Sequence, residues 1–280
     1  MPAADPARRD RFLEGLRGGG RLMGILNVTP DSFSDGGRFN DPEAALIQAR
    51  RMAGEGADIL DVGGESTRPG FEPVPEAEEA ARVLPVLEAL ARHLPEMPVS
   101  IDTTKPGVAR AAIGAGAVVV NDVWGFQGDP GMADAVAGTG AAAVLMHNRD
   151  RADPALDILA ELEAFFARSL RIADDAGVPK ERLVLDPGIG FGKTPLQNLI
   201  VLKRLRRLKQ LFDLPLLVGL SRKSTIGRVL DGRPAEGRLF GTIGADLYAH
   251  HAGASALRVH DVGVHRDALR LWRAIEAADG

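Results

Sequence analysis

The chain has 280 residues, of which 45% are apolar and 26% charged, and it contains no cysteine. This composition is typical of a globular protein with a large core, and it excludes disulfide bonds. No apolar run reaches the roughly 18 residues that a membrane span needs, and residues 1–20 lack the apolar stretch of a signal peptide. The net charge of −4, the lack of a basic block and an aromatic content of 5% argue against nucleic acid as a partner. We therefore expect a cytoplasmic protein that binds neither membranes nor nucleic acid.

Eight short apolar runs, each ending in polar residues, predict eight β-strands. A Gly-Ala pair precedes four of these runs, and Gly is the expected stop signal of the helix before a strand. The predicted strands are residues 22–28, 59–62, 99–102, 118–122, 142–147, 183–186, 216–220 and 256–260.

Stretches with a period near 3.6 alternate with these strands and predict helices. Eight strand-helix units in about 250 residues favour an α/β fold of the (β/α)8 TIM-barrel type over a doubly wound sheet, which has fewer strands and a phosphate fingerprint. We predict one domain over residues 1–280, with residues 1–20 as an N-terminal extension. The predicted helices are residues 8–16, 42–54, 76–93, 106–113, 132–137, 156–175, 195–211, 223–251 (as two helices) and 264–278.

The sixth strand leads into Asp186-Pro-Gly-Ile-Gly-Phe-Gly-Lys. The three glycines and Pro187 forbid regular structure after the strand and let a ligand approach the backbone. A strand-end Asp can also be a simple turn former, but the glycines favour a site. The motif is neither a P-loop, because Pro187 replaces the required Gly, nor a dinucleotide fingerprint, because Lys193 replaces the third Gly.

Two polar loops follow the first and second predicted strands. The first begins at Asn27, and the second, residues 63–70, contains Thr67 and Arg68. Loops rich in Gly, Ser and Pro are either solvated connectors or lids over a site. Their position on adjacent units favours lids.

The last two strands end in residues suited to anions. Arg258 and His260 alternate, so both point to one face of the strand. An Arg inside a barrel strand is costly unless it meets an anion, which favours a functional role. Ser221 or Ser224 could cap the next helix, or that helix start could bind an anion beside Arg222 and Lys223.

The other histidines carry a weaker signal. His93 and His265 are predicted at the surface, and His147 lies near the strand ends without an evident partner. His250 and His251 are adjacent on a helix and point apart. No Cys or His cluster indicates zinc.

Seven motifs, in their order along the chain, resemble those of the bacterial dihydropteroate synthase family, a family of pterin-binding TIM barrels. The resemblance extends from about residue 21 to about residue 275, and residues 146–162 are its least similar part. The motifs are Asn27-Val-Thr-Pro-Asp-Ser-Phe-Ser-Asp-Gly-Gly, Glu65-Ser-Thr-Arg-Pro-Gly, Ser100-Ile-Asp-Thr, Asn121-Asp, Asp186-Pro-Gly-Ile-Gly-Phe-Gly-Lys, Ser221-Arg-Lys-Ser and Arg258-Val-His.

The resemblance implies condensation of 6-hydroxymethyl-7,8-dihydropterin diphosphate with 4-aminobenzoate, in folate biosynthesis, by a homodimer that uses Mg²⁺. Asp186 would accept hydrogen bonds from the pterin edge, and Asn121 would complete its recognition. The implied catalytic residues are Asp102, Lys223 and Arg258, with Asp102 stabilising positive charge as the diphosphate leaves. The other implied contacts are Asn27 with Mg²⁺, Thr67, Arg68, Arg258 and His260 with the diphosphate, and Lys223, Ser224, Phe191 and Pro69 with 4-aminobenzoate.

Chemistry agrees with this resemblance, since an aromatic amine needs little help from a base and the difficult event is diphosphate departure. A dissociative displacement is therefore favoured, and no serine triad or Cys suggests a covalent intermediate. Two alternatives stay open. A pterin-binding methyltransferase would have little use for Ser221-Arg-Lys-Ser or Arg258-Val-His, and a non-catalytic paralogue should lack the two loops or Lys223.

Overall fold

The computed structural model describes residues 3–29, 42–65 and 74–278, and eight strands lie within them. Their observed bounds differ from the predicted ones by one or two residues at half of the ends, since strand ends depend on hydrogen bonds that the apolar pattern does not mark. The strands are β1 (Arg21–Asn27), β2 (Ile59–Gly63), β3 (Val99–Asp102), β4 (Val119–Asp122), β5 (Ala142–Met146), β6 (Leu183–Asp186), β7 (Leu217–Val218) and β8 (Ala256–Val259).

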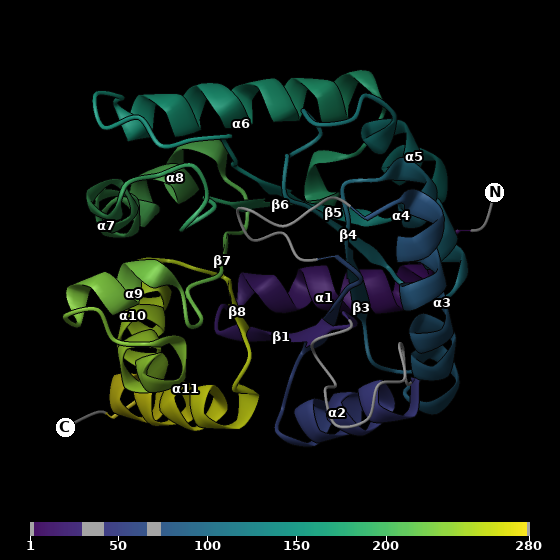
Figure 1. Cartoon of the computed structure of the whole chain (residues 1–280), viewed down its shortest axis with the longest axis horizontal. Coiled ribbons are helices and arrows are strands. Elements are labelled where there is room, and N and C mark those ends of the chain that lie inside the picture. The colour runs from purple at the N-terminus through teal and green to yellow at the C-terminus, as the bar shows by residue number, and fades with distance from the viewer. Residues whose placement is uncertain (1–2, 30–41, 66–73, 279–280) are drawn as a thin grey trace.

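The strands pair in parallel in the order β6-β5-β4-β3-β2-β1-β8-β7. A parallel bridge between Leu185 and Leu216 joins the two ends of this order, so the sheet closes into a barrel. The predicted (β/α)8 barrel is therefore confirmed. Figure 1 shows the strands near the centre and most helices around them.

The helices of the described residues carry amphipathic or apolar faces that pack on the barrel. Helix boundaries follow local signals, such as Asp5 and Asp157, whose carboxylates accept hydrogen bonds from the first turns that they precede. The helices are α1 (Pro6–Arg17), α2 (Pro42–Gly54), α3 (Glu76–His93), α4 (Pro106–Gly114), α5 (Gly131–Thr139), α6 (Ile158–Asp175), α7 (Pro195–Lys203), α8 (Leu205–Phe212), α9 (Ser224–Val229), α10 (Leu239–His251) and α11 (Val262–Glu276), with 3-10 turns η2 (Lys180–Arg182) and η3 (Ala235–Arg238).

One predicted helix is two in the structure. Residues 195–211 break at Arg204, whose φ of −109° and ψ of 12° leave the helical region and separate α7 from α8. Residues 223–251 form two α-helices, as predicted, because Asp231 and Gly232 take positive φ values between them.

The strands are buried on both faces, as expected when side chains alternate between the barrel interior and the surrounding helices. Every residue of β2, β3, β4, β5 and β6 is buried. No helix of the described residues is long and apolar enough to cross a membrane.

The N-terminal helix α1 packs on the end of the barrel from which the strands begin. Phe12 and Leu16 are buried in the core, Arg9 donates to the carbonyl oxygen of Gly140, and Arg11 donates to that of Glu96. Gly140 precedes β5 and Glu96 precedes β3, so α1 contacts the amino ends of the strands. The opposite end, where the strands finish, stays available for a site.

Candidate functional site

An arginine inside the mouth, the end of the barrel formed by the carboxyl ends of the strands, is held between two carboxylates. The Arg258 guanidinium on β8 donates to Asp61 on β2 at 2.6 Å and to Asp102 on β3 at 2.9 Å. All three side chains are largely buried, with Asp61 fully so. The sequence predicts an anion beside Arg258. In the structure, the carboxylates of Asp61 and Asp102 fill that role.

Asn121 on β4 joins the same cluster. Its side-chain Nδ2 donates to the Asp61 carboxylate at 3.1 Å. An Asn oxygen facing a carboxylate would be repelled, so Asp61 fixes the orientation of the amide. The Oδ1 oxygen of Asn121 is thereby left as an acceptor.

Three buried oxygens of this cluster have no partner within the part of the chain that the structure describes. They are Oδ1 of Asp61, Oδ1 of Asp102 and Oδ1 of Asn121. Buried polar atoms are nearly always hydrogen-bonded in native proteins, and exceptions need an explanation. The mouth presents acceptors that an N–H-rich ligand could satisfy.

The Asp102 carboxyl changes its charge near neutral pH. The pKa of this carboxyl is raised to about 7, chiefly by burial; the Arg258 charge opposes the rise and the nearby Asp61 charge adds to it. Perturbed carboxyls of this kind gather at functional sites.

Asp186, at the end of β6, lies under the glycine loop of residues 187–192. Its Oδ1 accepts the backbone N–H of Gly188 at 2.7 Å, and Gly188 has a φ of 63° that suits glycine. Burial raises the pKa of Asp186, while the positive charge of Lys223 opposes the rise. The carboxylate is thus a buried acceptor beside a cation.

Lys223 contacts the same loop from the other side. Its Nζ donates to the carbonyl oxygen of Ile189 at 2.5 Å and lies 4.5 Å from the centre of the Phe191 ring. Burial lowers the pKa of Lys223 to about 8, and the Asp186 charge opposes the fall. The structure brings Asp186, Lys223 and Phe191 together, as the sequence predicted.

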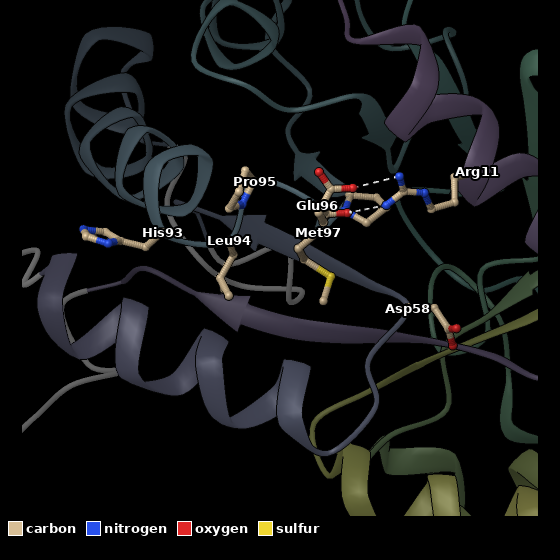
Figure 2. Close-up of a pocket in the computed structure, with 8 residues that line it drawn as sticks. Arg11, Asp58, His93, Leu94, Pro95, Glu96 and Met97 are labelled. Carbon is tan, nitrogen blue, oxygen red and sulfur yellow. Dashed lines mark hydrogen bonds and ion pairs between the residues drawn. The ribbon is translucent and has the colours of Figure 1, made fainter.

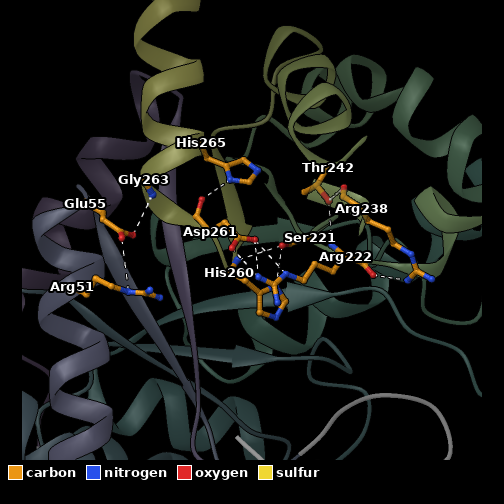
Figure 3. Close-up of polar contacts among 10 residues, drawn as sticks. All are labelled: Arg51, Glu55, Ser221, Arg222, Arg238, Thr242, His260, Asp261, Gly263 and His265. Atoms are coloured by element: carbon orange, nitrogen blue, oxygen red, sulfur yellow. Dashed lines mark hydrogen bonds and ion pairs between the residues drawn. The ribbon is translucent and has the colours of Figure 1, made fainter. Parts of the chain in front are cut away.

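The loop after β7 is fixed by polar contacts shown in Figure 3. Ser221 Oγ lies 2.9 Å from His260 Nδ1, so Ser221 does not cap a helix. Arg222 has a φ of 61° and forks onto the Asp261 carboxylate, so its charge is already neutralised. Ser224 is the exposed first residue of α9, and no side chain caps that helix. The capping interpretation of Ser221 and Ser224 was therefore wrong.

The expectation that His265 lies at the surface was also wrong. This residue of α11 is 2% exposed, and its Nε2 lies 3.0 Å from Asp246 Oδ2 on α10. Its Nδ1 donates to the carbonyl oxygen of Asp261 at 2.7 Å (Figure 3). Burial alone would lower the pKa of His265, but Asp246 outweighs it and raises the pKa. This buried pair ties two helices together behind the mouth. His93 is exposed, as predicted.

Asn27 ends β1 and is half-buried beside the Asp102 cluster. A Cβ placed at Gly63 would lie 3.7 Å from Asn27 Oδ1 and 3.6 Å from the Cβ of Asp102, so Gly63 keeps the space between them open. Among the described residues, no group of three His, Cys, Asp or Glu side chains could hold a metal ion. The predicted residues Thr67, Arg68 and Pro69 lie outside the described residues.

Two buried charged residues were missed by the sequence reasoning as site residues. Asp61 lies within the predicted strand of residues 59–62, and a charge inside an apolar strand is itself a signal of function. Lys193 was considered only within rejected phosphate motifs. In the structure its Nζ lies 2.7 Å from Nδ1 of His147, which supplies the partner that His147 lacked.

A hollow lies at the other end of the barrel (Figure 2). Its volume is about 420 Å³, and its lining comes from α1 and the segments before β2 and β3. Arg11 pairs with Glu96 at 2.8 Å, and Asp58 accepts from Arg21 and Arg266. The lining residues, all within the described ranges, contain no buried polar side-chain atom without a partner. This hollow therefore offers no comparable chemistry.

Comparison with known proteins agrees with the geometry of the mouth. Residues 23–260 match the family described as pterin binding enzyme. A dihydropteroate synthase of Clostridium beijerinckii is 49% identical over 245 residues, covering 86% of this chain and 88% of that protein. The dihydropteroate synthase of Xanthomonas albilineans solved with 4-aminobenzoic acid has a TM-score of 0.88 at 47% identity, covering 92% and 94% of the two chains. Its complex with 7,8-dihydropteroate gives 0.84 at 45% identity and the same coverage. The chain therefore belongs to the dihydropteroate synthase family of pterin-binding enzymes.

Proposed function

We propose that this protein is a transferase that condenses 6-hydroxymethyl-7,8-dihydropterin diphosphate with 4-aminobenzoate, giving 7,8-dihydropteroate and pyrophosphate. The observation that carries the proposal is the set of buried acceptors without partners at the mouth, beside Asp186 and Lys223. Family membership supports this synthase rather than a methyltransferase or a non-catalytic paralogue. The presence of Lys223 and Arg258 in the mouth supports it as well.

Pterin recognition rests on acceptors of fixed orientation. The amino-pyrimidinone edge of a pterin presents parallel N–H donors, which a carboxylate such as Asp186 can accept as it accepts those of Arg. The Oδ1 of Asn121 supplies a further acceptor, because the Nδ2 of the same amide is turned towards Asp61 and donates to it. Acceptors that have no partner within the protein become satisfied when such a ligand binds.

Bond cleavage requires charge stabilisation at two places. As the diphosphate leaves, positive charge develops on the methylene and is shared with the pterin, and the Asp102 carboxylate can stabilise it. Arg258 has five N–H donors and its two carboxylates use two of them, so it can also contact the diphosphate. His260, with Thr67 and Arg68, is proposed to complete the diphosphate contacts.

The second substrate would bind between the glycine loop and the start of α9. Its aromatic amine is unprotonated at neutral pH and attacks the methylene without a strong base. Lys223 and Phe191 already lie together and can form one wall of the pocket, to which Pro69 would be added. The exposed Ser224 hydroxyl is proposed to meet the carboxylate.

Mg²⁺ is the proposed cofactor, with Asn27 as its protein ligand. Mg²⁺ is usually bound by one or two protein oxygens together with substrate phosphates and water, and the Asn27 amide beside the open space at Gly63 suits that role. When bound, the ion would neutralise charge on the departing diphosphate. With Asn27 as ligand, the ion and the diphosphate would lie on the β1 side of the mouth.

A homodimer and a cytoplasmic location are the remaining parts of the proposal. Large apolar side chains of α10 and α11 are exposed, including Phe240 at 81% and Leu271 at 65%, which supports an interface there. Sedimentation of the wild-type chain and of Phe240→Asp tests this point. A monomeric wild-type protein at micromolar concentration would contradict it.

The reaction is tested by pyrophosphate release from purified protein. We expect release only when both substrates and Mg²⁺ are present, with dihydropteroate formed in equal amount. The matched control omits 4-aminobenzoate, which separates condensation from simple hydrolysis of the diphosphate. Absence of dihydropteroate under these conditions would contradict the assignment as a synthase.

A further inference from the structure

Lys193 is a buried lysine to which the proposed reaction assigns no role. It follows the glycine loop and is 8% exposed. Its Nζ lies 2.7 Å from Nδ1 of His147, 2.8 Å from the carbonyl oxygen of Gly188 and 3.1 Å from that of Phe191. An ammonium group has three N–H donors, and here each has an acceptor.

His147 is held as one of those acceptors. Its side chain is fully buried, and its ring packs edge-on against Phe165 with ring centres 4.7 Å apart. Burial, together with the Lys193 charge, lowers the pKa of His147 to about 2. The imidazole is therefore neutral, and its Nδ1 accepts from Lys193 when the lysine is protonated.

The glycine loop closely approaches the segment that follows β5 at two points. A Cβ at Gly188 would lie 1.9 Å from the carbonyl oxygen of His147, and one at Gly192 would lie 2.5 Å from the Cβ of Arg149. Only glycine allows this approach. The loop therefore lies close to β5, and the Lys193 ammonium bonds it there.

The same loop contacts both halves of the proposed site. The Gly188 N–H donates to Asp186, and the Ile189 carbonyl oxygen accepts from Lys223. The Phe191 ring lies under the Lys223 ammonium. Lys193 bonds the carbonyl oxygens of Gly188 and Phe191 on either side of Ile189, so a loop that shifts would move both contacts at once.

We propose that Lys193 is a positioning residue for the condensation, because its ammonium holds the glycine loop so that Asp186 and Lys223 face the two substrates together. The inference rests on the proposed function. Lys193 touches neither reacting atom, and it acts through the backbone of residues 188–191. Burial lowers the pKa of Lys193 to about 7 and the Asp186 charge opposes the fall, so the protonated lysine also helps to keep Asp186 ionised.

The test compares Lys193→Met with Lys203→Met, an exposed lysine on α7 that serves as a matched control. In Lys193→Met we expect the KM values for the pterin diphosphate and for 4-aminobenzoate each to rise at least tenfold, and affinity for a pterin without the diphosphate to fall similarly. Lys203→Met should keep all three values. A folded Lys193→Met protein with all three within twofold of wild type overturns the inference, since a purely structural lysine would lower only the melting temperature.

A second pair of variants covers the case in which Lys193→Met does not fold. His147→Gln keeps an oxygen that can accept from Lys193, whereas His147→Leu removes the acceptor. We expect His147→Leu to raise both KM values at least threefold above those of His147→Gln, and equal values for the two variants would overturn the inference. Wild-type protein is assayed beside them. If it forms no dihydropteroate the proposed function fails, whereas active wild type with unaffected variants removes only the role of Lys193.

Discussion

The charged side chains at the two ends of the barrel differ in how deeply they are buried and in whether their oxygens have partners. At the amino end, around the hollow of about 420 Å³, Asp58 is bonded by Arg21, Arg266 and a backbone N–H, and Arg11 is paired with Glu96. At the mouth, Arg258 is shared by two carboxylates, and oxygens of both lack partners. The charged side chains around the hollow at the amino end thus have partners, whereas the mouth has buried oxygens without partners.

This difference separates stability from function. A satisfied ion pair near the surface contributes little and needs no ligand. A buried acceptor without a partner costs free energy, and that cost is recovered when a ligand supplies the donor.

The largest expected effect comes from removing the cation of the mouth. Arg258→Met leaves Asp61 and Asp102 buried together without a counter-charge, which should lower the free energy of unfolding by about 3–5 kcal/mol. The loss should be greater at pH 8 than at pH 5, because the carboxyls can escape repulsion by binding a proton at low pH. Urea unfolding at both pH values measures it.

The double variant Arg258→Met with Asp61→Asn is the control for that measurement. Because it removes one of the two repelling charges, it should recover at least about 1 kcal/mol. No recovery, or a loss that does not depend on pH, would show that the carboxylates are not held by Arg258.

The next effect concerns Asp186 and compares it with another buried strand-end carboxylate. Asp186→Asn places an N–H against a pterin donor, which costs about 1–3 kcal/mol or more and should lower pterin affinity at least tenfold. Each carboxylate oxygen of Asp122 instead accepts a hydrogen bond from a backbone N–H, one from Trp124 and one from Phe126. Asp122→Asn should therefore lower the melting temperature and leave pterin affinity unchanged, and calorimetry distinguishes the two outcomes. Equal pterin affinity in wild type and Asp186→Asn would refute the assignment.

The pH dependence of kcat/KM should follow two mouth residues. Because burial raises the pKa of Asp102 to about 7, this carboxyl becomes ionised and competent as pH rises through that value. Because burial lowers the pKa of Lys223 to about 8, its positive charge is lost as pH rises further. Activity should therefore peak between these values and fall on each side by up to about tenfold per pH unit. In Asp102→Asn the acid limb should disappear at a lower overall rate, and a limb that persists would exclude Asp102 as its source.

The smallest effect is expected at the amino end. Arg11→Met removes the pair with Glu96, whose partners are both more than half exposed, so stability should change by no more than about 1 kcal/mol. Steady-state kinetics should not change. A large loss of activity would mean that a change at the amino end alters catalysis at the mouth. The contrast between the two ends would then no longer hold.

Much of the fold and part of the site could be predicted because they are encoded locally. Apolar runs and glycine stops located all eight strands, and a closed barrel necessarily gathers their ends. Asp102, Asn121 and Asp186 therefore had to lie at one mouth once the fold was known. The helix break at Arg204 was missed, since it rests on one residue's backbone angles and leaves little trace in the apolar period.

Pairing across the barrel was decided only by the tertiary structure. Arg258 meets Asp61, which lies 197 positions earlier, because β8, β1 and β2 are neighbours in the closed sheet. The burial of His265 depends on how α10 packs on α11, and the bond between Lys193 and His147 depends on how closely a loop approaches β5. Composition and periodicity determine which residues lie at the strand ends, since those signals act over a few residues. Which charges meet, and which acceptors remain for a ligand, depends on closure and register over the whole chain.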